Sequence, residues 1–149
     1  MAEYLSTAAQ NVNLNSPIIF TASIPCRKGY IYFEDETGNF ILRGITDNCF
    51  ARYRVIYNGN IAIPEGGTAG AIAVALEVNG SERVSSKAIV TPAAAEQFFN
   101  VTSTATITVP RGCCFSLSVN AVPASADPTV TPAPVIVAQN SNLTIERIA

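Results

Sequence analysis

Few residues in this chain are of the types that carry out catalysis, and histidine is absent from all 149 positions. That absence excludes Ser-His-Asp and Cys-His centres, histidine-ligated metal sites and the commonest general base. Cys113 remains as a nucleophile, with Arg111 as a positive neighbour, but the chain offers no base to activate the thiol. The sequence therefore predicts no catalytic residue and no enzyme.

Two short motifs could hold a ligand but are better explained as turns. The acidic run at residues 34–36 could supply carboxylates to a divalent cation, although a solvated turn is the favoured interpretation. The glycine-rich run at residues 66–70 lacks the lysine that follows a phosphate-binding loop. We therefore expect neither a metal site nor a cofactor.

Carbohydrate chemistry has little support in the sequence. Glycoside hydrolysis needs two carboxylates that face one cleft. The eleven acidic residues are spread along the chain without an obvious pair, and tryptophan, the usual platform for a sugar ring, is absent. A carbohydrate-active enzyme is kept only as a distant alternative.

The charge of the chain argues against two further classes of partner. Only 13% of the residues are charged, against about 25% in ordinary globular proteins, and the net charge is −2. The basic residues are scattered, so no stripe is present to bind a nucleic-acid backbone. No run of about 18 apolar residues predicts membrane insertion, and the first residues do not resemble a signal peptide. We expect synthesis in the cytoplasm without export by that route.

The four cysteines do not form a recognisable zinc or disulfide pattern. Cys113 and Cys114 are adjacent, and a bond between neighbours in a strand would be strained. Cys26 and Cys49 could pair. Without an export signal, reduced and partly buried thiols are the favoured expectation.

Alternating apolar and polar residues predict strands along most of the chain. The clearest is 72–78, which is followed by the Asn79-Gly80 hairpin signal and a partner strand at 83–90. Strands are also expected at 51–57, before a turn at 58–60, and at 61–64. Further strands are expected at 18–24, 29–33, 40–43, 104–109, 115–120 and 143–148.

Only one helical turn is expected, at residues 93–98 after Pro92. Eight or more short strands without crossover helices predict an all-β antiparallel sandwich or barrel. The domain should cover residues 18–149, preceded by a polar arm at 1–17 that could dock onto a neighbouring subunit. Four prolines predict a long surface loop at 121–138.

Small uncharged residues opposite the apolar face of two strands suggest contact with a neighbouring subunit. Ala73 and Ala75 lie opposite the large aliphatic residues of 72–78, and three polar residues of 115–120 lie opposite its apolar ones. The sequence alone cannot distinguish a core position from a subunit interface. The candidates for one or the other role are Tyr53, Tyr57, Ala73, Ala75, Phe115, Leu117 and Ile145.

Four segments carry a resemblance to a known family: 53–57, 74–80, 109–113 and 140–148. They resemble four strands of the C1q/TNF-like jelly roll. In the same order, these are a core strand, the strand before an Asn-Gly hairpin, a strand entered through a glycine turn, and the closing strand. The match covers about residues 40–149. It is most similar to the bacterial and phage version, found at the end of collagen-like spore-surface glycoproteins and as stand-alone phage structural proteins.

This resemblance implies a ten-stranded, two-sheet jelly roll that forms a tight homotrimer and serves adhesion, recognition or decoration. The chain departs from the pattern in lacking a Gly-X-Y stalk and in carrying the proline-rich insertion. The expected function is therefore a non-enzymatic, homotrimeric phage virion component, such as a capsid decoration protein, head fibre or receptor-binding tip. The alternative is a bacterial surface or spore-coat adhesin. Expected partners are further copies of the chain and other virion or cell-surface proteins, with glycans as another ligand class.

Overall fold

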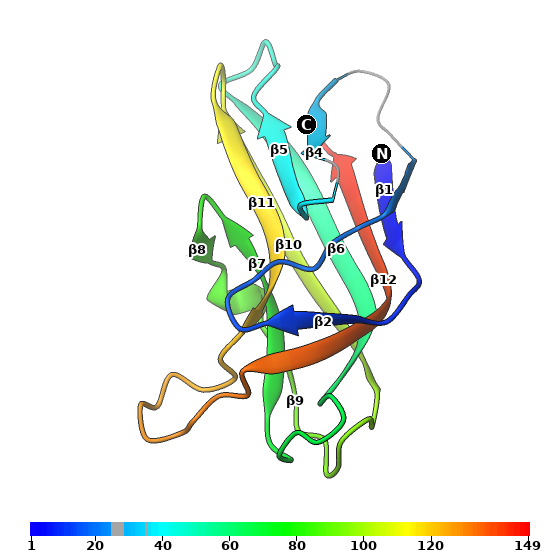
Figure 1. Ribbon diagram of the computed structural model, residues 1–149. Helices are drawn as coiled ribbons and strands as arrows, with labels where there is room; N and C mark the ends of the chain where they lie inside the picture. The colour runs from blue at the N-terminus through cyan, green and yellow to red at the C-terminus, as the bar shows by residue number, and fades with distance from the viewer. Residues whose placement is uncertain (25–28, 35) are drawn as a thin grey trace.

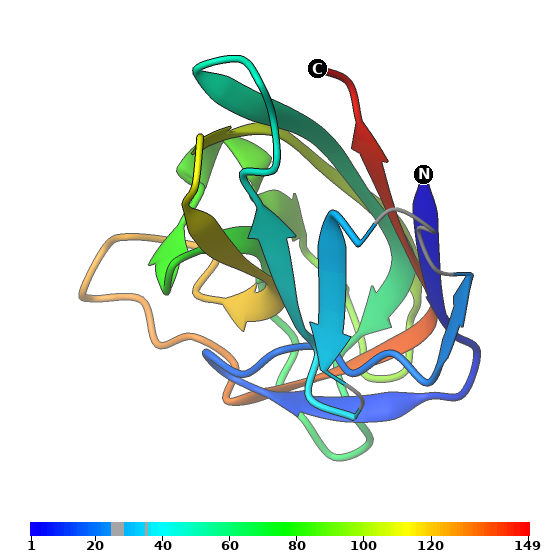
Figure 2. The ribbon, with the colours of Figure 1, turned by 90° about the horizontal axis from the view of Figure 1, so that it is seen from above.

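The computed structural model describes residues 1–24, 29–34 and 36–149, and two packed antiparallel sheets account for most of them (Figure 1). Seen from above, the sheets form the two layers of a sandwich (Figure 2). Sheet A has the strand order β10-β6-β12-β1-β3, and β2 pairs with the other part of β12. Its strands are β1 (Ala2–Ser6), β2 (Gln10–Asn13), β3 (Ala22–Ile24), β6 (Phe50–Ala62), β10 (Phe99–Pro110) and β12 (Val135–Arg147).

Sheet B has the order β4-β5-β11-β7-β8, and β9 also pairs with β7. Its strands are β4 (Ile31–Glu34), β5 (Asn39–Arg43), β7 (Ile72–Val78), β8 (Ser81–Glu82), β9 (Ala88–Val90) and β11 (Cys114–Val122). The predicted all-β, two-sheet antiparallel architecture is confirmed. The described residues contain no helix with the length and hydrophobicity needed to span a bilayer.

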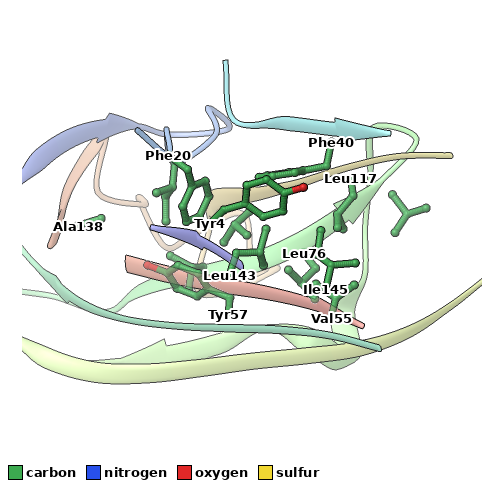
Figure 3. Packing of buried hydrophobic residues seen from close by; sticks show 14 of the residues in the cluster. Tyr4, Phe20, Phe40, Val55, Tyr57, Leu76, Leu117, Ala138, Leu143 and Ile145 are labelled. Atoms are coloured by element: carbon green, nitrogen blue, oxygen red, sulfur yellow. The ribbon is translucent and has the colours of Figure 1, made fainter. Parts of the chain in front are cut away.

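The inner faces of the two sheets form one hydrophobic core (Figure 3). Strand alternation places Tyr53, Val55 and Tyr57 of β6 on that side, and all three are completely buried. An aromatic group closes one part of the core, where the ring of Phe40 lies 4.5 Å from that of Tyr4 and 4.8 Å from that of Phe33. Tyr4 comes from sheet A and the two phenylalanines from sheet B, so these rings hold the sheets together.

The hairpin at Asn79-Gly80 is present as predicted. Val78 pairs with Ser81, so two residues form the turn, and Asn79 and Gly80 have φ angles of 52° and 78°. Both angles lie in the left-handed region that this tight turn requires. The strand predicted at 83–90 is wrong over most of its length: the hairpin partner is β8 at Ser81–Glu82, a 3₁₀ turn follows at Val84–Ser86, and only Ala88–Val90 (β9) is a strand.

The turn predicted at residues 58–60 is wrong, because β6 runs without a break from Phe50 to Ala62. Asn58, Gly59 and Asn60 pair with Thr102, Val101 and Asn100 of β10, so this asparagine-rich stretch is held as a strand by its neighbours. Tertiary pairing here overrides a local turn preference. The helical turn predicted at 93–98 is also absent: the segment forms bends and turns, and Glu96 has a left-handed φ of 61°.

The N-terminal segment is part of the sandwich rather than a separate arm. β1 lies between β12 and β3, and Tyr4 is buried in the core. Further along, the Ile18 amide donates to the carbonyl of Val119 at 2.8 Å, so the chain continues beside β11. Polar residues such as those of β1 can occupy a strand whose outer face meets solvent.

The proline-rich loop is shorter than predicted. β11 continues to Val122 and β12 begins at Val135, so the connection covers residues 123–134 instead of 121–138 (Figure 1). Ala121 and Ala138 are buried strand residues. The prediction missed these strand residues because the apolar residues at the end of β11 and at the start of β12 do not alternate with polar ones.

The thiols that the structure describes are exposed, so the expectation of partial burial is wrong for them. Cys49, Cys113 and Cys114 are free and lie where the chain enters β6 or turns from β10 into β11. Side chains at such loop positions lie outside the sandwich core. Cys26 and its possible pairing with Cys49 lie outside the described residues.

Candidate functional site

Two surface regions of the structure have the character of binding sites. The first is the outward face of β10, β6 and β12 in sheet A, which we call the threonine face. Strand alternation turns the even-numbered residues outward in β10, in β6 from Phe50 to Asn58, and in β12 beyond its register shift between Gln139 and Asn142. Its members are Phe50, Arg52, Arg54, Ile56, Asn58, Thr102, Thr104, Thr106, Thr108, Thr144, Glu146 and Ile148.

The centre of the threonine face is uncharged. Ile56 lies there between Thr104 of β10 and Thr144 of β12, its partners in register, and 36% of Ile56 is exposed. Phe50 and Ile148 add two more exposed apolar side chains towards one end. An apolar, charge-poor centre is the composition found in the buried core of protein interfaces.

Charges on this face lie beside the uncharged centre, and one arginine of the two is paired with a glutamate. Arg54 is paired in register with Glu146, and the nearest nitrogen and oxygen are 4.0 Å apart. Both side chains are about half exposed, so solvent screens their attraction. This pair can set the register of a contact but adds little to its strength.

The second region is a groove at one end of the sandwich, which we call the end groove. It lies between the 63–71 connection and the 124–135 segment and has a volume of about 810 Å³. That volume is within the range of ligand-binding pockets in proteins. Of the described residues that line it, one is ionisable, Glu65.

The predicted site residues fall into two groups, and the structure places all of them within a single chain. Tyr53, Tyr57, Leu117 and Ile145 are completely or almost completely buried in the main core, and Phe115 is half-buried against it. Side chains that are buried within one chain are not available to a neighbouring subunit. Their tyrosine hydroxyls are paired: that of Tyr53 donates to the Arg43 carbonyl at 2.6 Å.

Ala73 and Ala75 form a separate small cluster on the other side of β7. They are covered by Val122 and by the half-buried Ala124 at the start of the 123–134 connection. The small residues of this strand therefore accommodate part of the same chain. The threonine face, which remains open, lies on the opposite sheet.

Sequence reasoning did not select the threonine face, although a signal was present. Thr104, Thr106 and Thr108 alternate with apolar residues in the sequence, and this pattern predicts an outward row. Which outward rows stay open depends on the packing of distant segments, and that information is not local. Asp35 of the acidic run lies outside the described residues.

No described group of three or more His, Cys, Asp or Glu side chains has the arrangement of a metal site. Comparison with known proteins found no matching family model and no matching curated protein. Among solved structures, the globular domain of zebrafish complement 1qA protein superposes with a TM-score of 0.58 at 12% identity, covering 96% of this chain and 94% of that one. The fold is a C1q-like jelly roll.

A second solved structure, described as the EclA C-terminal domain, a sugar-binding protein, is less similar. Its TM-score is 0.45 at 16% identity, with 95% of this chain and 79% of that chain covered. At these identities a structural likeness shows the fold, while function has to be argued from the surface of this chain. The likeness to the zebrafish domain and the two-sheet topology confirm the predicted jelly roll. The phage or bacterial origin implied by the resemblance stays a prediction.

Proposed function

We propose that this chain is a non-enzymatic structural or adhesion domain that assembles into a homotrimer through the threonine face. The observation that carries the proposal is the exposed Ile56. It lies between Thr104 and Thr144, and the charged pair Arg54–Glu146 lies beside this uncharged centre. Burial of apolar surface drives association, and threonines allow close contact without the desolvation of a charge. The number of copies, three, follows from the resemblance described for the sequence.

Two features favour a binding role over catalysis. Among the described residues, Glu65 alone of the ionisable ones lines the end groove, and the hydroxyls of Tyr53 and Tyr57 form hydrogen bonds inside the sandwich. A domain of this kind acts through broad faces and loops. Three copies in one assembly would strengthen weak contacts, since linked sites bind with a higher effective concentration.

The threonine face is tested by a charge at its centre. Ile56→Glu should convert the assembly to monomers, because association would bury an unpaired carboxylate. Ile89→Glu is the matched control, since Ile89 is a similarly exposed isoleucine on β9 of the other sheet. Analytical ultracentrifugation measures the mass, and circular dichroism checks that both variants fold. Equal assembly of the two folded variants would refute the role of this face.

Within this assembly role, we propose a phage virion component such as a decoration protein, head fibre or receptor-binding tip. The uncharged centre of the threonine face and the C1q-like fold support a part that binds to other proteins and displays loops. An antibody raised against the chain and used for immunogold microscopy distinguishes the alternatives. Labelled particles support the virion role, whereas label confined to bacterial surfaces supports an adhesin and contradicts it.

A further inference from the structure

The end groove opens where two strand pairs separate. Ala62 of β6 still pairs with Val137 of β12, and Ala73 of β7 still pairs with Val122 of β11. Beyond these positions the strands part, and the 63–71 connection and the 124–135 segment form the two sides of the groove. The open space therefore lies at the end of both sheets, beside the ends of β6 and β11 and the starts of β7 and β12.

Some main-chain groups on both sides of the groove have no hydrogen-bond partner among the described residues. Residues 67–71 run without a turn or bend, as do residues 131–133. Thr68, Ala69 and Gly70 make no backbone hydrogen bond with any residue that the structure describes, and the same holds for Thr131 and Ala133. An extended chain presents its N–H and C=O groups alternately to each side, so these segments can pair with another extended chain.

The side chains along the groove are small enough for a backbone to approach. A Cβ atom added to Gly70 would meet no other atom within 4 Å, so the chain at this point borders open space. Ala69, Ala71 and Ala133 also line the groove. Small residues and glycine are what a close approach between two backbones requires.

The groove has an acidic side and lacks a basic residue. Glu65 lines it, and the backbone amide of Glu96 donates to the carbonyl of the lining residue Ile63 at 2.8 Å, which places a second acidic residue close by. Neither lining segment contains lysine or arginine. An occupant with a positive charge would therefore complement it.

We propose that the end groove binds an extended peptide segment of a partner protein, one with small side chains and at least one lysine or arginine. The peptide adds a strand beside Thr68–Gly70 or Thr131–Ala133 through main-chain hydrogen bonds, and Glu65 binds its basic residue. The groove is formed by the loops at the end of the sandwich. The inference is therefore independent of assembly through the threonine face.

Gly70→Trp is the sharpest test, because the indole would fill the groove while the backbone φ of this glycine lies outside the left-handed region. Val84→Trp is the matched control, since Val84 is 71% exposed and does not line the groove. The probe is an array of synthetic ten-residue peptides, followed by fluorescence anisotropy with the peptides that bind. We expect Gly70→Trp to bind at least tenfold more weakly than the wild type and Val84→Trp to bind equally well.

Glu65→Lys tests the charge preference. This variant should bind peptides that contain a basic residue more weakly than the wild type does. It should bind versions in which that residue is replaced by glutamine as well as the wild type does. A glycan array probed with the same proteins separates the other class of ligand. The proposal is overturned if no peptide binds at micromolar concentration, if Gly70→Trp binds peptides as the wild type does, or if the groove binds glycans alone.

Discussion

The hydroxyls of Tyr57 and Ser141 lie 3.0 Å apart and join β6 to β12 inside the sandwich. Ser141 faces inward because the register of β12 shifts between Gln139 and Asn142, and Asn140 adopts a left-handed φ of 53°. This β-bulge directs a polar side chain into the core. The hydrogen bond then satisfies two hydroxyls that burial would otherwise leave without partners.

Burial raises the pKa of Tyr57 to about 12, although the hydrogen bond with Ser141 acts in the opposite direction. In the unfolded chain the phenol ionises near its ordinary value of about 10. Between these two values the unfolded state holds fewer protons, so stability falls as the pH rises. We expect a loss of about 2 to 3 kcal/mol from this group between pH 10 and 12.

Urea unfolding of the wild type and of Tyr57→Phe at pH 7 and pH 11 checks this expectation. At pH 7 the variant should lose about 1 kcal/mol, because Ser141 loses its partner. Its decrease in stability between the two pH values should be smaller than that of the wild type. Tyr32→Phe is the control, since Tyr32 is 60% exposed. An unchanged pH dependence in Tyr57→Phe would contradict the assignment.

Gly59 provides the space for this hydrogen bond. A Cβ atom at position 59 would lie 2.4 Å from the Tyr57 hydroxyl oxygen and 3.2 Å from Oγ of Ser141. Gly59→Ala should therefore destabilise the fold by about 1 to 3 kcal/mol through overpacking. Gly70→Ala serves as the control, because its added methyl group meets open space. Equal unfolding free energies for the two variants would show that position 59 is not crowded.

Gly80 tests backbone strain separately from crowding. Nothing lies within 4 Å of a Cβ atom added there, but the φ angle is 78°. Gly80→Ala should cost about 1 to 2 kcal/mol because an L-residue is disfavoured in the left-handed region. Thermal unfolding beside Gly70→Ala measures the difference. No loss of stability would mean that the hairpin rearranges at little cost.

Lys87 forms an ion pair with one of two glutamates that face each other at the β7–β8 hairpin. Its Nζ atom is 3.0 Å from Glu82, which pairs in register with Glu77. The pKa of Glu77 is raised by partial burial and then by the charge of Glu82. Ionisation of Glu77 therefore costs stability as the pH rises through its folded-state pKa.

Lys87→Met should remove the neutralising charge and make this loss steeper. The variant should be about 1 kcal/mol less stable than the wild type at pH 7, and the gap should narrow as the pH falls and Glu77, whose pKa is raised, takes up a proton. Urea unfolding at pH 7 and pH 4 measures both quantities. A gap that stays constant with pH would point to lost packing of the lysine side chain instead.

Local sequence patterns predict the fold well where the two faces of a strand differ from each other in residue type. The alternation at 72–78 and the Asn79-Gly80 turn correspond to β7 and its hairpin. The same rules fail for Asn58–Asn60, which two neighbouring strands hold in extended form. They also fail for β1, whose burial depends on β12 at the other end of the chain. Turn preferences are local, whereas pairing partners are not.

The candidate sites were harder to predict than the fold. The end groove is built from loop segments 63–71 and 124–135, whose closeness depends on the whole sandwich. The small residues Ala73 and Ala75 suggested a subunit contact, but the structure covers them with Val122 and Ala124. A small side chain indicates close approach without indicating which segment approaches. That choice is made by the topology.

The mass of the wild-type chain in solution, measured by light scattering over a range of concentrations, tests assembly most directly. The measurement is made with and without reductant, because Cys49, Cys113 and Cys114 are exposed and could cross-link copies. We predict three times the 15.7 kDa chain mass under both conditions. A folded monomer at micromolar concentration would contradict assembly through the threonine face, and a trimer that disappears with reductant would assign it to disulfides instead.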